Sequence, residues 1–520
     1  MNRVAVGLLL LLVSACGHAP DEDRPMTLSA SDLARQLRTG ELTATEVTRD
    51  YLSRIDALNA AGPRLGAVLE LNPHALYDAG ALDDAFVRSG PVGPLHGLPV
   101  LIKGNIDVEG LTASAGSLAL ADIKATEDAH LVARLRAAGA VILGTTNLSE
   151  WANFRDGNST SGWSSLGGQT RNPHVLDRNP CGSSSGSAVA VAAHLAPLAV
   201  GTETHGSIVC PASVNGVVGI KPTVGLVSRS GIVPISHTQD TAGPMARSVM
   251  GAAMLLQAMI DPDPSDPGSV AAGFESVLPD PSVTDLAGRR IGILRKYRGA
   301  DSRPRVEAIH AEAVGLLGAL GATLVDPVQH SPGEGFWAAA YRVLLREFRV
   351  DLNDYLAAHH LPDDRDSLAD LIVYNDANAE SVMPVFGQSI FIEAEAMSGL
   401  DDPEYAADVA LVQTGLRRDL DALFASHGLD AIFIPVNGPA WKTDWVNGDH
   451  TSFGGTAYLA ALSGYPSVVL PAGTVDGLPV GVGFVGLPQS EPLLLQMAYA
   501  LEQALPPAPE PAFRPSIENP

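Results

Sequence analysis

The stretch LVARLRAAGAVILGTTN, residues 131–147, joins a helix pattern to a strand pattern within seventeen positions. Its first part is amphipathic, and Gly139 predicts the end of a helix. The short apolar run at residues 140–143 predicts a strand buried in a sheet. The segment AIHAEAVGLLGALGATLVDP, residues 308–327, repeats the same order of helix, glycine and strand. Repetition of this unit indicates an α/β fold.

Other segments extend this pattern along the chain. A serine and Gly40 bracket a predicted helix at residues 29–40, and a capping box, Thr43 to Glu46, opens a second helix that reaches about Asn59. Further short apolar strands are expected in LPVLIKGN (98–105), IGILRKY (291–297), LDAIFIPVN (429–437) and PSVVLPAG (466–473). This alternation predicts one large domain, a sheet with helices on both faces.

Two segments do not fit this alternation. Residues 336–400 are predicted to be helical and to form an insertion that shapes the substrate site. Five aromatic residues in it either line an apolar wall for the acyl side of a substrate or pack the core: Trp337, Tyr341, Phe348, Tyr355 and Phe391. The tail, residues 506–520, is too rich in proline to form a helix or strand. The main domain is therefore expected at residues 31–505.

Composition excludes some functions. The 520 residues are 46% hydrophobic and 18% charged, as in a large enzyme with much buried surface. The net charge of −25 argues against a nucleic-acid-binding surface, which needs a basic face. The sequence has neither metal-ligand spacing nor a phosphate-binding glycine loop, so we expect neither a metal nor a cofactor.

The N-terminal segment MNRVAVGLLLLLVSAC has the pattern of an export signal. We expect residues 1–15 to be a signal peptide, Cys16 to be lipidated, and residues 16–30 to form a tether to the cell-envelope membrane. Ordinary cleavage after Ala15 is the alternative. The exported protein would be periplasmic or membrane-anchored, contacting the membrane through its lipid alone. Cys181 and Cys210 would then lie in an oxidising compartment, although the sequence does not show whether they are bonded.

The segment CGSSSGSAVAVAAHL, residues 181–195, raises the question of a nucleophilic serine. It contains a literal G-x-S-x-G around Ser184, but a nucleophile elbow needs a strand running into the turn. The preceding residues, 170–180, have two prolines and two asparagines and lack an apolar run. We therefore assign Ser184, Ser185 and Ser187 to loop hydrogen bonds and to the start of a helix.

A strand–turn–helix context does occur at GTETHGSI, residues 201–208, which follows the apolar run 198–200. Small residues in such a loop let backbone N–H groups converge as an oxyanion hole, and Ser207 at its end is a candidate nucleophile. His205 is too close along the chain to serve as its base. Lys103 and Lys221 each end an apolar strand, where burial would produce a neutral amine, and the pattern separates them only slightly.

Three motifs together resemble the amidase signature family. LHGLPVLIKGN matches its lysine motif, CGSSSGSA its serine-rich loop, and GTETHGSIVCPAS its nucleophile loop, in the family's order. The resemblance runs from about residue 31 to the GLPVGVGFVG segment near the C-terminus. It implies the family's fold, a large mixed sheet covered by helices on both faces.

The resemblance also implies a Ser–cis-Ser–Lys triad. Ser207 would be the nucleophile, Ser183 the bridging serine in a cis bond, and Lys103 the base. The oxyanion donors would be the backbone N–H groups of Thr204, His205, Gly206 and Ser207. This chain departs from the family pattern at four positions: Gly104 stands for an aspartate, and Cys181, Ser185 and His205 stand for glycines. His205 would narrow or polarise the pocket.

The implied activity is hydrolysis of carboxamide C–N bonds through an acyl-enzyme. Within the family the sequence looks most like bacterial peptide amidases, which release ammonia from the C-terminal amide of peptides. Small aliphatic or aryl amides are the alternative substrates. An amidotransferase subunit of tRNA charging and an inactive binding lipoprotein are further alternatives. Export and the acidic composition count against the amidotransferase, and retention of all three triad residues counts against the inactive protein.

Overall fold

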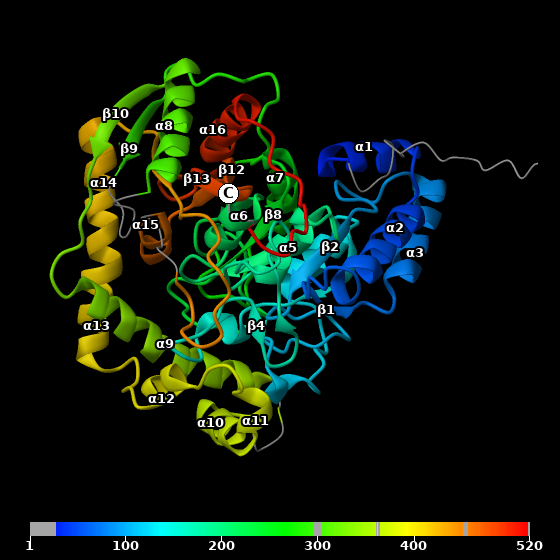
Figure 1. Ribbon diagram of the computed structural model, residues 1–520, viewed down its shortest axis with the longest axis vertical. Coiled ribbons are helices and arrows are strands. Elements are labelled where there is room, and N and C mark those ends of the chain that lie inside the picture. The colour runs from blue at the N-terminus through cyan, green and yellow to red at the C-terminus, as the bar shows by residue number, and fades with distance from the viewer. Residues whose placement is uncertain (1–27, 296–302, 360, 362–364, 451–455, 518–520) are drawn as a thin grey trace, which may run out of the picture.

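A computed structural model describes residues 28–295, 303–359, 361, 365–450 and 456–517 (Figure 1). The described residues form one eleven-stranded sheet in the order β1-β3-β2-β6-β8-β7-β12-β13-β11-β9-β10, and a two-stranded ribbon of β4 and β5. The strand bounds are β1 Val68–Leu71, β2 Pro99–Lys103, β3 Val141–Thr146, β4 Trp163–Ser164, β5 Gly168–Gln169, β6 Leu198–Glu203, β7 Val218–Lys221, β8 Thr241–Ala246, β9 Arg290–Leu294, β10 Thr323–Val328, β11 Ala431–Pro435, β12 Ser467–Val475 and β13 Leu478–Val485.

The sheet is mixed. Strands β3, β2 and β6 are parallel neighbours, as are β11, β9 and β10, whereas the strands between these two groups pair antiparallel. β2 and β6 therefore end at the same edge of the sheet. Lys103 ends β2 and Glu203 ends β6, so the fold brings the lysine motif and the nucleophile loop together.

The helices cover the sheet in two sets, which confirms the predicted class of fold. Helices α5 and α6 contact each other and the central strands, and α7, α8 and α16 form a second contacting set on the same part of the sheet. The helix bounds are α1 Ala30–Thr39, α2 Ala44–Ile55, α3 Ala75–Ser89, α4 His130–Ala137, α5 Ser185–Ala192, α6 Val209–Asn215, α7 Val249–Met259, α8 Pro304–Ala319, α9 Phe336–Ala358, α10 Leu368–Ala377, α11 Ala379–Val382, α12 Ser389–Glu395, α13 Pro403–Val409, α14 Gly415–His427, α15 Thr456–Ser463 and α16 Glu491–Ala504. Short 3-10 or π-helical turns are η2 Asp56–Ala60, η3 Leu118–Leu120, η4 Glu150–Asn153 and η5 Ala410–Thr414.

Local capping residues set the first helices as predicted. The Ser29 side chain accepts a hydrogen bond from the Asp32 N–H at the start of α1, and Gly40 ends it with φ +74°. Thr43 and Glu46 form the capping box of α2. α2 continues as the π-helical turn η2 up to Ala60, close to the predicted end of the second helix.

The helix–strand unit at residues 131–147 is also confirmed. It forms α4 and β3, and β3 extends to Thr146, three residues beyond the predicted strand. Register explains the extra length, because β3 pairs along its whole length with β2, up to Lys103 opposite Thr146. Strand ends thus depend on the partner strand as well as on the local sequence.

The helical insertion lies at the lower edge of Figure 1, with α9 to α12 in sequence. Phe348 and Phe391 are fully buried and pack with Trp151 and Leu352 in a hydrophobic cluster. Tyr355 packs against the same cluster, whereas the more N-terminal Trp337 and Tyr341 are 39% and 38% exposed. Core packing is therefore the role of Phe348 and Phe391, and the proposed apolar wall is not formed by the five aromatic residues together.

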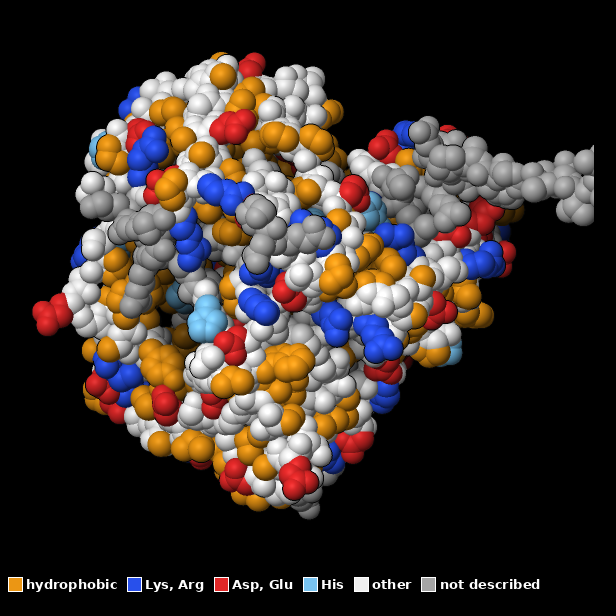
Figure 2. Space-filling model, in the orientation of Figure 1, with side chains coloured by type: hydrophobic (Ala, Val, Ile, Leu, Met, Phe, Trp, Pro, Cys, Tyr) orange, Lys and Arg blue, Asp and Glu red, His pale blue; other side chains and the backbone are white. Residues whose placement is uncertain are grey.

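The two chain ends bear on other predictions. The signal peptide 1–15, Cys16 and most of the tether lie outside the described residues. The tail contains neither helix nor strand up to residue 517, as predicted, but it lies on the domain through the N–H of Phe513, which donates to the Pro173 carbonyl oxygen at 2.9 Å. None of the described helices is long and apolar enough to cross a bilayer. On the face drawn in Figure 2, basic side chains are interspersed with acidic and apolar ones.

Candidate active site

Lys103 lies at the end of β2 with its side chain fully buried. Its Nζ donates to Ser183 Oγ at 2.7 Å and to Thr202 Oγ1 at 2.7 Å, and lies 3.3 Å from the Thr202 carbonyl oxygen. The fold therefore joins the first two predicted triad residues, which are 80 positions apart in the chain.

Burial sets the protonation of this lysine. Loss of hydration lowers the pKa of Lys103 to about 7, and the negative charges of Asp240 and Glu203 act in the opposite direction. A substantial fraction of the side chain is therefore a neutral amine near neutral pH, which is the form that can accept a proton. Lys103 has the position and the charge state of a base.

The competing lysine is placed differently. Lys221 ends β7, is equally buried, and burial lowers its pKa to about 8. Its Nζ donates to the Pro222 carbonyl oxygen at 3.0 Å rather than to a serine hydroxyl. The structure thus distinguishes two lysines that the sequence pattern left nearly equal.

The serine-rich loop places Ser183 away from its neighbours. The Gly182–Ser183 peptide bond is cis, as the resemblance implied. Ser184 Oγ donates to the Thr202 carbonyl oxygen at 2.9 Å, Ser185 Oγ to that of Cys181 at 2.5 Å, and Ser187 Oγ to that of Val200 at 2.9 Å. These three hydroxyls hold the loop and α5 in place, as predicted, and Ser183 is the one that reaches Lys103.

The nucleophile loop runs from β6 into α6. Glu203 Oε2 accepts hydrogen bonds from the N–H groups of Ile208 at 2.7 Å and Val209 at 3.0 Å, so its carboxylate holds the first turn of α6. Gly206 has φ +90°, a conformation that favours glycine. None of the described residues accepts a hydrogen bond from the backbone N–H groups of residues 204–207. These donors are therefore available to a substrate oxygen.

Ser207 lies next to the serine-rich loop. Its carbonyl oxygen accepts a hydrogen bond from the Ser184 N–H at 3.1 Å, and the residue is 8% exposed. Among the described residues, no hydrogen bond joins the hydroxyls of Ser183 and Ser207. Catalytic hydrogen bonds often shorten only when substrate binds, so the loops have the right neighbourhood for a relay that substrate would complete.

Two departures from the family motifs have structural consequences. A Cβ atom at Gly104 would lie 2.9 Å from the Thr146 carbonyl oxygen, so this backbone position has no room for the family's aspartate without a shift. His205 is half-buried, and burial lowers its pKa to about 4. The imidazole beside the oxyanion loop is therefore neutral near pH 7.

Sequence reasoning missed Thr202 and Asp240. Thr202 Oγ1 accepts hydrogen bonds from Lys103 Nζ and from Asn105 Nδ2, the latter at 3.1 Å. Asp240 accepts a hydrogen bond from the Thr204 hydroxyl through one oxygen and bonds from the N–H groups of Ile235 and Ser236 through the other. The chain around Asp240, SHTQDTAGP, lacks the pattern of a catalytic motif.

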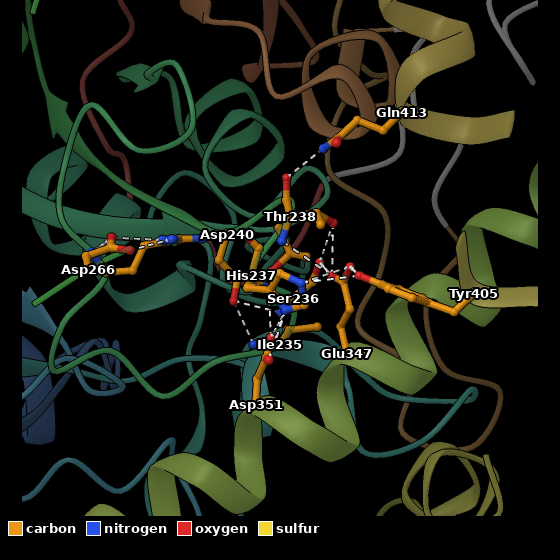
Figure 3. Close-up of polar contacts among 12 residues, drawn as sticks. Ile235, Ser236, His237, Thr238, Asp240, Asp266, Glu347, Asp351, Tyr405 and Gln413 are labelled. Atoms are coloured by element: carbon orange, nitrogen blue, oxygen red, sulfur yellow. Dashed lines mark hydrogen bonds and ion pairs between the residues drawn. The ribbon is translucent and has the colours of Figure 1, made fainter. Parts of the chain in front are cut away.

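Asp240 belongs to a polar network that joins its loop to the helical insertion (Figure 3). Glu347 on α9 accepts hydrogen bonds from the hydroxyls of Ser236 and Tyr405, and Asp351, one turn further on, lies 2.9 Å from His237 Nδ1. The carboxylates of α9 thus already have hydrogen-bond partners. The network fixes the loop that carries Asp240.

The chain is similar to known proteins over most of its length. The family model "Amidase" matches residues 46–495. The chain belongs to the amidase family. A probable amidase from Arabidopsis thaliana is 39% identical over 475 residues, covering 89% of this chain and 87% of its own length. This amidase is therefore a hydrolase of amide C–N bonds with the fold that the motifs implied.

Solved structures give the same assignment. The peptide amidase described in complex with the competitive inhibitor chymostatin is 47% identical, with a TM-score of 0.87, and the match covers 93% of this chain and 98% of that one. The native peptide amidase from Stenotrophomonas maltophilia is 46% identical, with a TM-score of 0.87 and coverage of 95% and 99%. A glutamyl-tRNA(Gln) amidotransferase subunit from Salinispora arenicola is 35% identical, over 94% of this chain and 99% of its own.

The charge around Lys103 predicts a pH profile. We expect kcat/KM to rise with pH through about 7, because deprotonation produces the neutral amine. Replacing Asp240 with asparagine removes a negative charge that favours the ammonium form, so this limb should move to lower pH. Initial rates between about pH 5 and 10 would test both statements. A limb that is unmoved or displaced to higher pH in Asp240→Asn would contradict the proposed electrostatic role.

Proposed function

We propose that this amidase removes the C-terminal amide of peptides and releases ammonia. The observation that carries the proposal is the 47% identity to a peptide amidase structure over 93% of the chain. A peptide amide presents a neutral –NH₂ terminus. The pocket should accept this small leaving group and exclude a further residue.

We further propose that Lys103, Ser183 and Ser207 carry the reaction. Ser207 attacks the amide carbonyl while its proton passes through Ser183 to neutral Lys103. The free N–H groups of residues 204–207 stabilise the oxyanion that forms. Proton return to the leaving nitrogen releases ammonia, and water then hydrolyses the acyl-enzyme. The 2.7 Å hydrogen bond between Lys103 and Ser183 and the low pKa of Lys103 support this order of proton transfers.

The substrate assignment predicts a ranking of amides. We expect ammonia release from a dipeptide amide to exceed that from benzamide and acetamide in kcat/KM, because a peptide offers more groups for transition-state binding. The measurement is ammonia production by the purified enzyme at equal substrate concentrations. A clear preference for either simple amide would show that small amides are the substrates.

A second candidate follows from the amidotransferase relatives, which are similar over almost the whole chain. Those relatives are named for a reaction on glutamyl-tRNA, whereas this chain has a net charge of −25 and a predicted export signal. Glutamine added to the same ammonia assay separates the two functions. Release from glutamine that exceeds release from the dipeptide amide would favour the amidotransferase function.

The place of action is also a proposal. We propose that the enzyme is a cell-envelope lipoprotein anchored through Cys16, where it would meet peptides outside the cytoplasm. Mass spectrometry of the mature N-terminal peptide should find residue 16 first and lipidated. A soluble product with unmodified Cys16 would contradict the anchor while leaving the enzymatic proposal intact.

A further inference from the structure

A disulfide bond joins Cys181 to Cys210, which answers the question that the sequence left open. Cys181 precedes Ser183 by two residues, and Cys210 follows Ser207 by three. At the other end of the same two segments, the Ser184 N–H donates to the Ser207 carbonyl oxygen at 3.1 Å. Residues 181–184 and 207–210 therefore form a closed ring, and both proposed catalytic serines lie within it.

The corners of this ring are held in turn by the surrounding structure. The Cys181 N–H donates to Asn179 Oδ1 at 2.7 Å, and its carbonyl oxygen accepts the Ser185 hydroxyl. The Cys210 N–H donates to the Gly206 carbonyl oxygen at 2.9 Å, within the turn that carries Ser207. Movement at either cysteine would therefore pass directly to a catalytic loop.

Both half-cystines are buried beside the site. Each is 1% exposed, and they pack in an apolar cluster whose other buried members are Val175, Val214, Ala440 and Leu478. The bond crosses from the serine-rich loop to the first turns of α6. It thus links the two segments covalently at the place where their mutual position matters for proton transfer.

We infer that Cys181 and Cys210 are positioning residues of the amidase reaction, whose disulfide clamps the Ser183 loop against the Ser207 loop. This inference rests on the proposed roles of the two serines. Without the bond, the ring would be open at its cysteine end and closed at the other by the single Ser184–Ser207 hydrogen bond. Displacements of about 1 Å between reacting groups can cost a hundredfold in rate, so loosening the ring should affect turnover before it affects substrate binding.

The test is a double variant, Cys181→Ala with Cys210→Ala, which removes the bond without leaving a thiol. Its kcat for a dipeptide amide, divided by the folded fraction from circular dichroism, should fall about tenfold or more, with a much smaller change in KM. The rate of labelling at Ser207 by a fluorophosphonate probe should fall in parallel. A loss of stability alone would leave both quantities, counted per folded molecule, unchanged.

Leu478→Ala is the matched control. Leu478 packs in the same cluster, and its truncation should lower the melting temperature while leaving the disulfide bond and kcat per folded molecule unchanged. If Leu478→Ala lowers kcat as much as the double variant does, the effect comes from the cluster and not from the bond. Such a result would overturn the inference.

The outcomes also separate this inference from the proposed function. Absence of probe labelling at Ser207 in the wild-type enzyme would overturn the proposed mechanism itself. Labelling at Ser207 in the wild type with an equal rate in the double variant would overturn the clamp alone. Failure of the double variant to fold at any temperature would show that the bond serves folding, and would overturn the positioning role as well.

Discussion

Ser207→Ala should lose amide hydrolysis almost completely, with kcat reduced by about ten-thousandfold or more, as for other enzymes that lose a nucleophile. The reason is geometric. Ser207 ends a run of four backbone N–H groups that lack an acceptor among the described residues, and it adjoins the loop that connects Ser183 to Lys103. The measurement is single-turnover and steady-state ammonia release from a dipeptide amide.

Ser184→Ala is the matched control for this variant. Ser184 lies in the literal G-x-S-x-G sequence, but its hydroxyl donates to the Thr202 carbonyl oxygen and accepts from the Thr202 N–H at 3.1 Å. It should therefore keep most of its activity and lose some stability, about 1 kcal/mol for each hydrogen bond removed. An acyl group trapped on Ser184 and identified by peptide mass spectrometry would refute the assignment of the nucleophile.

Lys103→Met should lower kcat by about a thousandfold or more, within the range for loss of a general base together with its hydrogen-bonded relay. Methionine keeps much of the buried volume but cannot accept the proton from Ser183. The remaining activity should also lose the pH-dependent limb near 7, because the group that titrates there is gone. Rate measurements across pH distinguish this result from a simple loss of folded enzyme.

Lys221→Met provides the comparison for this second variant. Lys221 is buried at the end of a strand like Lys103, but its Nζ contacts the Pro222 carbonyl oxygen and neither catalytic serine. We expect its kcat and pH limb to be close to those of the wild type. Full activity in Lys103→Met would remove the proposed base, and an equal loss in both variants would leave Lys103 without a distinct catalytic role.

Much of the fold follows from local sequence. The serine and glycine at the ends of α1, the capping box of α2 and the apolar runs of β2, β9, β11 and β12 act within a few residues of where they stand. Such signals are legible because capping, backbone conformation and burial periodicity depend on near neighbours. The three motifs also predicted the serines and lysine that are proposed for the site.

Tertiary structure decided the rest, because it depends on contacts between distant parts of the chain. Lys103 and Lys221 have the same local pattern, and the parallel pairing of β2 with β6 brings Lys103 to Ser183 and Thr202. Asp240 reaches Thr204 from 36 positions away, and Cys181 reaches Cys210 across 29. Phe348 and Phe391 pack the core because α9 and α12 fold onto Trp151. A residue's neighbours in space set its pKa, its hydrogen-bond partners and its exposure, and one stretch of sequence does not contain them.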